Sequence, residues 1–313
     1  MAWTDPLLEH LAAAEALGYR PGGSPASEPT ALAALALLAQ GRAADAEPKL
    51  RWLAERQAAD GSVGITATEA APGWPTPLAV LAWARGTRDG ASADRSLTKG
   101  EDSATSLSRL PQRPRWSRHI HRATDWLLRT EGKQVPPSGE GHDTTLIGWP
   151  WVDGTHSWVE PTALAILALK ATGRGGHPRT REAVRLLLDR LLPDGGCNCG
   201  NTVVFGQTLV PQVQPTGLAL LALAGEHDPS CRIERSIEYL WRALDEHTTP
   251  ASLAYGLLGL AAHGRECCMS EEWLAAAAAV ALKRQSALEM ALLLLGAAGP
   301  SSLLVQPRAN LRK

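Results

Sequence analysis

The chain has 313 residues, of which 44% are hydrophobic, and this is enough apolar material for a large buried core. Its 31 basic and 32 acidic residues leave a net charge of −1 and form no basic stripe, which excludes nucleic acid as the main partner. The first residues resemble no secretory leader, and the longest apolar runs, such as residues 273–282, are far shorter than the ~18 residues of a membrane span. We therefore expect a cytoplasmic protein without a transmembrane segment.

A short pattern recurs along the chain and marks the starts of similar helices. Four times, Pro-Thr opens an almost uncharged run of alanine and leucine that closes at or near a glycine. These starts are Glu28-Pro29-Thr30, Trp74-Pro75-Thr76, Glu160-Pro161-Thr162 and Gln214-Pro215-Thr216, with weaker copies at Thr249-Pro250 and Gln285-Ser286. Proline suits the first turn of a helix, and glycine suits the position just past its end. The pattern predicts six helices that are apolar all round and therefore buried.

A second kind of helix precedes most of these copies. It carries a pair such as Trp52-Leu53 or Trp126-Leu127 among charged residues, which is typical of a helix with one wet face. A first helix over residues 6–17 would complete a set of six. The alternation of amphipathic and wholly apolar helices predicts an all-α fold. Closing the array into a ring hides the apolar helices from water. We expect a toroid, a closed α/α barrel of six helical hairpins.

Two segments do not fit the repeat. Residues 86–115 are rich in Ser, Asp, Arg and Gly with little apolar periodicity, and they are predicted to form a mobile insertion. Residues 298–313 are expected to be a flexible basic tail. Residues 1–297 would then form a single toroid domain.

Two segments carry a resemblance to a known family. Residues 49–64 resemble the QW repeat of squalene and oxidosqualene cyclases, with Gln57 four positions after Leu53, then Gly61, and Val63 in place of the closing tryptophan. Residues 194–201 keep an Asp-Gly-Gly but have Cys197 where an aromatic residue is usual. Over residues 7–296 the chain is similar to the prenyltransferase and squalene-oxidase repeat proteins. The resemblance implies the toroid and an isoprenoid substrate.

The motifs that carry the family's activities are missing. The D-x-D-D acid motif of class II terpene cyclases does not occur, and Asp194 with Cys197 lacks the spacing of the zinc ligands of protein prenyltransferases. The sequence therefore assigns no catalytic residue and leaves open whether the protein is an enzyme. No cofactor is expected.

A tryptophan-rich loop supplies the candidate substrate-binding site. In a helical barrel this loop would lie at one mouth of the ring, where tryptophan faces can stack on an isoprenoid or stabilise a carbocation. The candidate residues are Trp149, Trp151, Asp153, His156, Trp158 and Glu160. In the alternative interpretation the tryptophans plug the ring and Glu160 caps a neighbouring helix.

Three functions remain open. The first is a toroid that binds or processes a hydrophobic isoprenoid, and the second is a non-catalytic ring scaffold for a protein partner. The third is a carbohydrate-active barrel, which requires two of Asp143, Asp153 and Glu160 to face each other across a cleft.

The cysteines are predicted to be reduced thiols, because five is an odd number and no export signal is expected. Cys197, Cys199, His263, Cys267 and Cys268 match no standard zinc spacing, so no metal is predicted.

Overall fold

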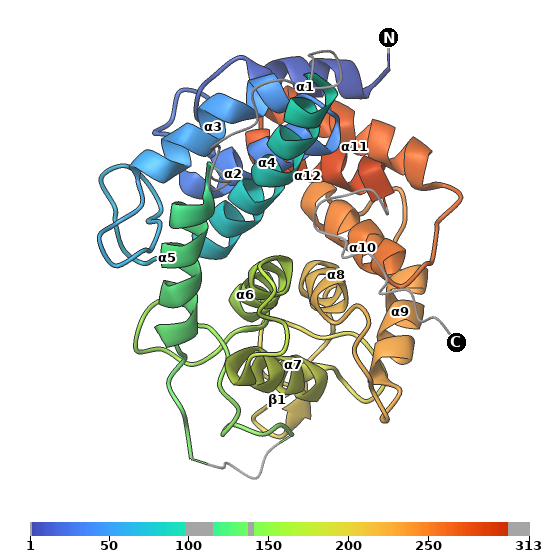
Figure 1. Cartoon of the computed structure of the whole chain (residues 1–313). Helices are drawn as coiled ribbons and strands as arrows, with labels where there is room; N and C mark the ends of the chain where they lie inside the picture. Colours follow the sequence, from blue (N-terminus) through green and yellow to red (C-terminus); the bar gives the residue numbers. More distant parts are fainter. Residues whose placement is uncertain (1, 98–114, 137–140, 300–313) are drawn as a thin grey trace.

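The computed structural model describes residues 2–97, 115–136 and 141–299, and this part of the chain is mostly helical (Figure 1). It contains twelve helices and one short hairpin of β1 (Val203–Val204) and β2 (Gln207–Thr208). The predicted all-α class is confirmed. Among the described helices, none is long and apolar enough to cross a membrane.

Five of the helices are buried on nearly every side, as is the first part of a sixth, residues 76–83. These six are α2 (Ser27–Ala39), α4 (Thr76–Leu97), α6 (Val159–Ala171), α8 (Val213–Ala222), α10 (Pro250–Ala262) and α12 (Ala287–Ala298). Each packs against the next in this order, and α12 also packs against α2. Four of them contain the predicted Pro-Thr starts in or beside their first turn.

The other six helices are amphipathic and lie outside the buried ones (Figure 1). They are α1 (Thr4–Ala12), α3 (Ala43–Glu55), α5 (Ser117–Arg129), α7 (Pro178–Arg190), α9 (Arg232–Ala243) and α11 (Ser270–Arg284). Their buried residues, such as Leu50 and Leu53 of α3 or Ile237 and Leu240 of α9, recur at helical spacing on one face.

Helix α4 differs from the sequence-based expectation at its end. It continues past Gly86 to Leu97, so the start of the expected mobile insertion is helical. A glycine inside a helix costs only about 1 kcal/mol relative to alanine, which tertiary packing readily offsets. The rest of that insertion, residues 98–114, and most of the expected tail, residues 300–313, lie outside the described part of the chain.

The threonine of each Pro-Thr start makes the same buried contact. The hydroxyls of Thr30, Thr76, Thr162 and Thr216 accept the backbone N–H of Leu17, Val63, Trp149 and Cys197, respectively, at 2.8–3.0 Å. All four threonines are 0% exposed, and each hydroxyl in turn donates to a nearby backbone carbonyl. A buried N–H needs a partner, so the threonine ties the preceding loop to the start of the buried helix.

Glycines bring α8 and α10 unusually close together. A Cβ on Gly217 would overlap the carbonyl oxygen of Tyr255, and one on Gly259 would lie 2.7 Å from the carbonyl oxygen of Gly217. Larger residues at these positions would push the two helices apart. Gly217 therefore sets the position of the α10 backbone at Tyr255.

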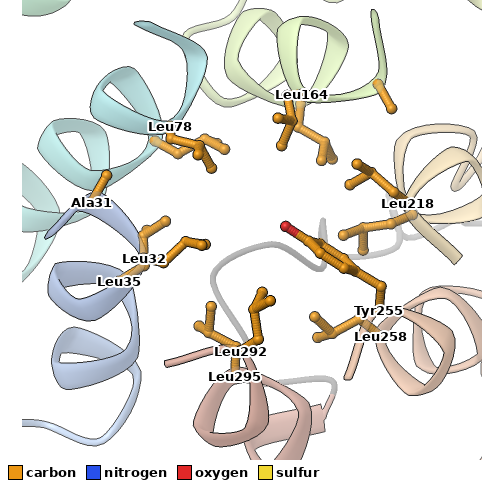
Figure 2. Packing of buried hydrophobic residues seen from close by; sticks show 14 of the residues in the cluster. Ala31, Leu32, Leu35, Leu78, Leu164, Leu218, Tyr255, Leu258, Leu292 and Leu295 are labelled. Atoms are coloured by element: carbon orange, nitrogen blue, oxygen red, sulfur yellow. The ribbon is translucent and has the colours of Figure 1, made fainter. Parts of the chain in front are cut away.

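Side chains of the six buried helices point toward a common centre (Figure 2). Most of them are leucines, among them Leu32, Leu78, Leu164, Leu218 and Leu292. The exception is Tyr255, whose hydroxyl group points into this centre. We call these side chains the inner cluster.

The threonine contacts can be tested with Thr162→Val, which keeps the side-chain shape and removes the hydroxyl. We expect the variant to lose about 1–3 kcal/mol of unfolding free energy in urea, because the buried N–H of Trp149 is left without a partner. The exposed Thr68 offers a control, and Thr68→Val should change stability by less than about 0.5 kcal/mol. Equal effects of the two substitutions would contradict this role.

Candidate functional site

Trp149 serves to join neighbouring helices. It is 2% exposed, and its indole N–H donates to the carbonyl oxygen of Leu127 on α5 at 3.0 Å. The guanidinium of Arg179 on α7 lies over its ring, 4.5 Å from the centroid, as in a cation–π contact. Because the side chain is almost fully buried and Arg179 covers one face of its ring, Trp149 offers little surface to a ligand.

Trp151 packs edge-on against Trp74, with 4.9 Å between the ring centroids. The two rings border a cavity of about 10 Å³, which also touches Trp126, Asp153 and Pro161. A volume of this size holds about one water molecule. An isoprenoid or a sugar therefore does not fit between these tryptophans as they stand.

His156 stacks on Trp158 with 4.4 Å between the ring centroids. His156 also lines a second cavity of about 210 Å³, together with Lys133, His142 and Arg190. The candidate loop thus faces two separate cavities, and its six residues do not form one site.

The carboxylates proposed for sugar chemistry have different surroundings. Asp143 accepts hydrogen bonds from Thr145, and these lower its pKa. Asp153 is exposed beside the small tryptophan cavity. Neither carboxylate interacts with Glu160 in the described part of the chain, so the arrangement gives no support to a paired carboxylate across a cleft.

Glu160 instead belongs to a second cluster at the amino-terminal ends of the buried helices. Its carboxylate accepts a hydrogen bond from Nε2 of Gln214 on α8 at 2.9 Å. Glu28, in the first turn of α2, accepts one from the hydroxyl of Tyr19 at 2.7 Å. Glu28, Glu160 and Gln214 each stand directly before a Pro-Thr pair, so the repeat brings them to the same end of the helices.

Burial favours the protonated form of both carboxyls. It raises the pKa of Glu28 to about 7, the hydrogen bond from Tyr19 opposes this rise, and the charge of Glu160 adds to it. Burial also raises the pKa of Glu160, against the hydrogen bond from Gln214. No described lysine or arginine pairs with either group, so the usual stabilising partner of a buried carboxylate is missing.

Tyr255 lies within reach of both charges. Burial raises the pKa of its phenol, and the charges of Glu28 and then Glu160 raise it further. The side chain is 5% exposed, and its hydroxyl makes no hydrogen bond to any residue that the structure describes. Two protonatable carboxyls and a free hydroxyl thus meet an apolar interior, a combination suited to holding the polar end of a hydrophobic molecule or to giving it a proton.

The sequence contained a signal for Glu28 and Gln214 that the loop-centred prediction missed. Aligning the four Pro-Thr starts places Glu28, Trp74, Glu160 and Gln214 at one position of the repeat, and equivalent positions of parallel helices share one end of the structure. Tyr255 had no such signal, because its run of residues differs little from the other apolar runs.

The cysteines offer no reactive thiolate near this cluster. Burial raises the pKa of Cys197 to about 12 and also raises that of Cys199. In the described ranges no three His, Cys, Asp or Glu side chains come together as a metal site would require.

Comparisons with known proteins support the fold alone. No family model and no curated protein matches the chain. A crystal structure of Salmonella alpha-2-macroglobulin reacted with methylamine is similar, with a TM-score of 0.51 and 16% sequence identity. The match covers 96% of this chain but only 17% of that chain, so the relationship is to a small part of a much larger protein.

The raised pKa of Glu28 predicts a pH dependence of stability. Because the folded-state pKa of about 7 exceeds the ordinary 4.5, protonated Glu28 stabilises the fold at low pH, and this contribution is lost as pH rises through about 7. Between about pH 5 and pH 8 we expect the wild type to lose roughly 1–3 kcal/mol more unfolding free energy than Glu28→Gln. Urea unfolding at several pH values measures this.

Glu246→Gln is the control for that experiment, since Glu246 is 70% exposed. It should follow the pH dependence of the wild type. If Glu28→Gln follows it as well, Glu28 does not titrate as described.

Proposed function

We propose that the chain is a closed α/α toroid of six hairpins that binds a hydrophobic, isoprenoid-type molecule among the leucines of the inner cluster. The order of packing of the six buried helices, with α12 against α2, supports the closed ring. The resemblance of residues 49–64 to a QW repeat supports the isoprenoid class.

One observation carries the proposal. Tyr255 presents a hydroxyl that bonds to no described residue to a centre walled mainly by leucine (Figure 2). Because this hydroxyl has no hydrogen-bond partner among the described residues, a ligand with a polar end can bond to it inside the leucine-walled centre. An apolar body with one polar end satisfies both the leucines and the hydroxyl.

The test is a thermal-shift comparison with farnesol, geranylgeraniol and detergent-solubilised squalene. A ligand at ~100 times its dissociation constant adds about 2.7 kcal/mol, which we expect to raise the unfolding midpoint by roughly 2–4 °C. Leu164→Trp, which fills the centre, should abolish the shift, whereas Val280→Trp on the exposed side of α11 should keep it. A shift that survives Leu164→Trp would place the ligand elsewhere and contradict the proposal.

A second candidate function is a scaffold for a protein partner, and the β1–β2 hairpin favours it. Phe205 at the hairpin tip is 98% exposed and has a φ of 50°, and Val210 beyond the hairpin is 78% exposed. Exposing such apolar side chains is costly unless another surface covers them.

Site-specific photo-crosslinking tests this candidate. With a photoreactive amino acid in place of Phe205, we expect one discrete adduct in living cells, and none with the same amino acid in place of Val280 on α11. Absence of an adduct at position 205, or equal labelling at both positions, would contradict the scaffold function.

A further inference from the structure

The two carboxyls and the tyrosine belong to alternate helices of the six that surround the inner cluster. Glu28 belongs to α2, Glu160 to α6 and Tyr255 to α10, and these helices alternate with α4, α8 and α12 in the order of packing. Glu28 and Glu160 lie four residues before Leu32 and Leu164, which point to the centre, and so they share the inward face of their helices with these leucines, as Tyr255 points inward from α10 (Figure 2). Their electrostatic coupling is consistent with this, since each carboxyl affects the tyrosine and Glu160 affects Glu28.

Among the described residues, Tyr19 and Gln214 donate hydrogen bonds to the carboxyls, and no lysine or arginine pairs with them. Tyr19 and Glu160 act on the pKa of Glu28, both carboxyls raise that of Tyr255, and Glu160 also raises the pKa of Cys197 and Cys199. Two carboxylates that share an apolar space repel each other, and each also loses hydration. A positive charge placed between them would offset both costs.

We propose that the molecule bound at the centre carries a primary amine, and that its ammonium group lies between Glu28 and Glu160 with the Tyr255 hydroxyl as a further acceptor. This inference rests on the proposed binding of a hydrophobic molecule. It narrows the ligand class from hydrophobic molecules in general to apolar amines.

The donor and acceptor inventory favours an amine over other polar ends. An ammonium group has three N–H donors, which matches two carboxylates and one hydroxyl oxygen. An alcohol has one donor and would leave the two carboxyls uncompensated, and an anionic end would meet two negative groups. Charge-assisted hydrogen bonds are roughly twice as strong as neutral ones, which adds to the preference.

The contributions of the hydrocarbon chain and of the polar group can be separated with three ligands that share the same chain. These ligands are farnesylamine, farnesol and farnesoic acid. At about pH 8 the amine is protonated and the acid ionised. We expect farnesylamine to bind at least tenfold more tightly than farnesol in calorimetry, and farnesoic acid to bind most weakly. Below about pH 7, amine binding should release protons, because burial raises the pKa of Glu28 to about 7 and binding of an ammonium group ionises this carboxyl, and farnesol binding should release none.

Glu28→Gln with Glu160→Gln removes both charges and keeps the side-chain shapes. In this double variant farnesylamine should bind no more tightly than farnesol, and proton release should disappear. Glu246→Gln should preserve the preference of the wild type. The double variant keeps the side-chain shapes, and its farnesol affinity reports directly whether it folds.

The outcomes separate the two claims. If farnesol binds as tightly as farnesylamine, or if the double variant keeps the amine preference, the amine inference is wrong while binding of a hydrophobic molecule stands. If none of the three ligands binds to the folded wild type, the proposed function fails and the inference fails with it.

Discussion

The arrangement of the molecule depends on one buried hydrogen bond that is repeated in four hairpins. In each, the hydroxyl of the threonine in a Pro-Thr pair accepts the N–H of a loop residue 13 or 19 positions earlier. Helices that are apolar all round have no polar face to fix their height or rotation, and leucine packing alone tolerates sliding. A directional bond in a dry site restricts both, so Thr30, Thr76, Thr162 and Thr216 set where each buried helix starts.

This constraint explains why polar and aromatic side chains lie together at the amino-terminal ends of the buried helices. The residue before each Pro-Thr pair is held at the same level of its helix, so the repeat places Glu28, Trp74, Glu160 and Gln214 in related positions. Trp74 packs on Trp151 and gives a closed, nearly dry contact. Glu28 and Glu160 lie at the apolar interior, and no described lysine or arginine pairs with them. The position before the Pro-Thr pair thus holds a packed tryptophan in one hairpin and a carboxyl group in two others.

The sequence predicted the buried helices, which depend on local periodicity. It did not predict the positions of side chains that tertiary contacts determine. The apolar runs and Pro-Thr pairs predicted the buried helices, because both signals act within one or two turns. The end of α4 was misjudged because Gly86 was taken as a terminus. Grouping Trp149 to Glu160 as one site rested on closeness in sequence, whereas Arg179, Trp74 and Gln214, all distant in sequence, determine where those side chains lie. Tyr255 is positioned through Gly217 on another helix.

The central claim is that two carboxyls, with no cationic partner among the described residues, share an apolar interior that binds a ligand. Carbon-13 NMR of glutamate-labelled protein tests it most directly, with the two signals assigned by Glu28→Gln and Glu160→Gln. The account predicts that Glu28 titrates near pH 7, that Glu160 titrates above its ordinary range, and that each substitution lowers the apparent pKa of the remaining carboxyl. Titration of both carboxyls near 4.5, each unaffected by loss of the other, would contradict it.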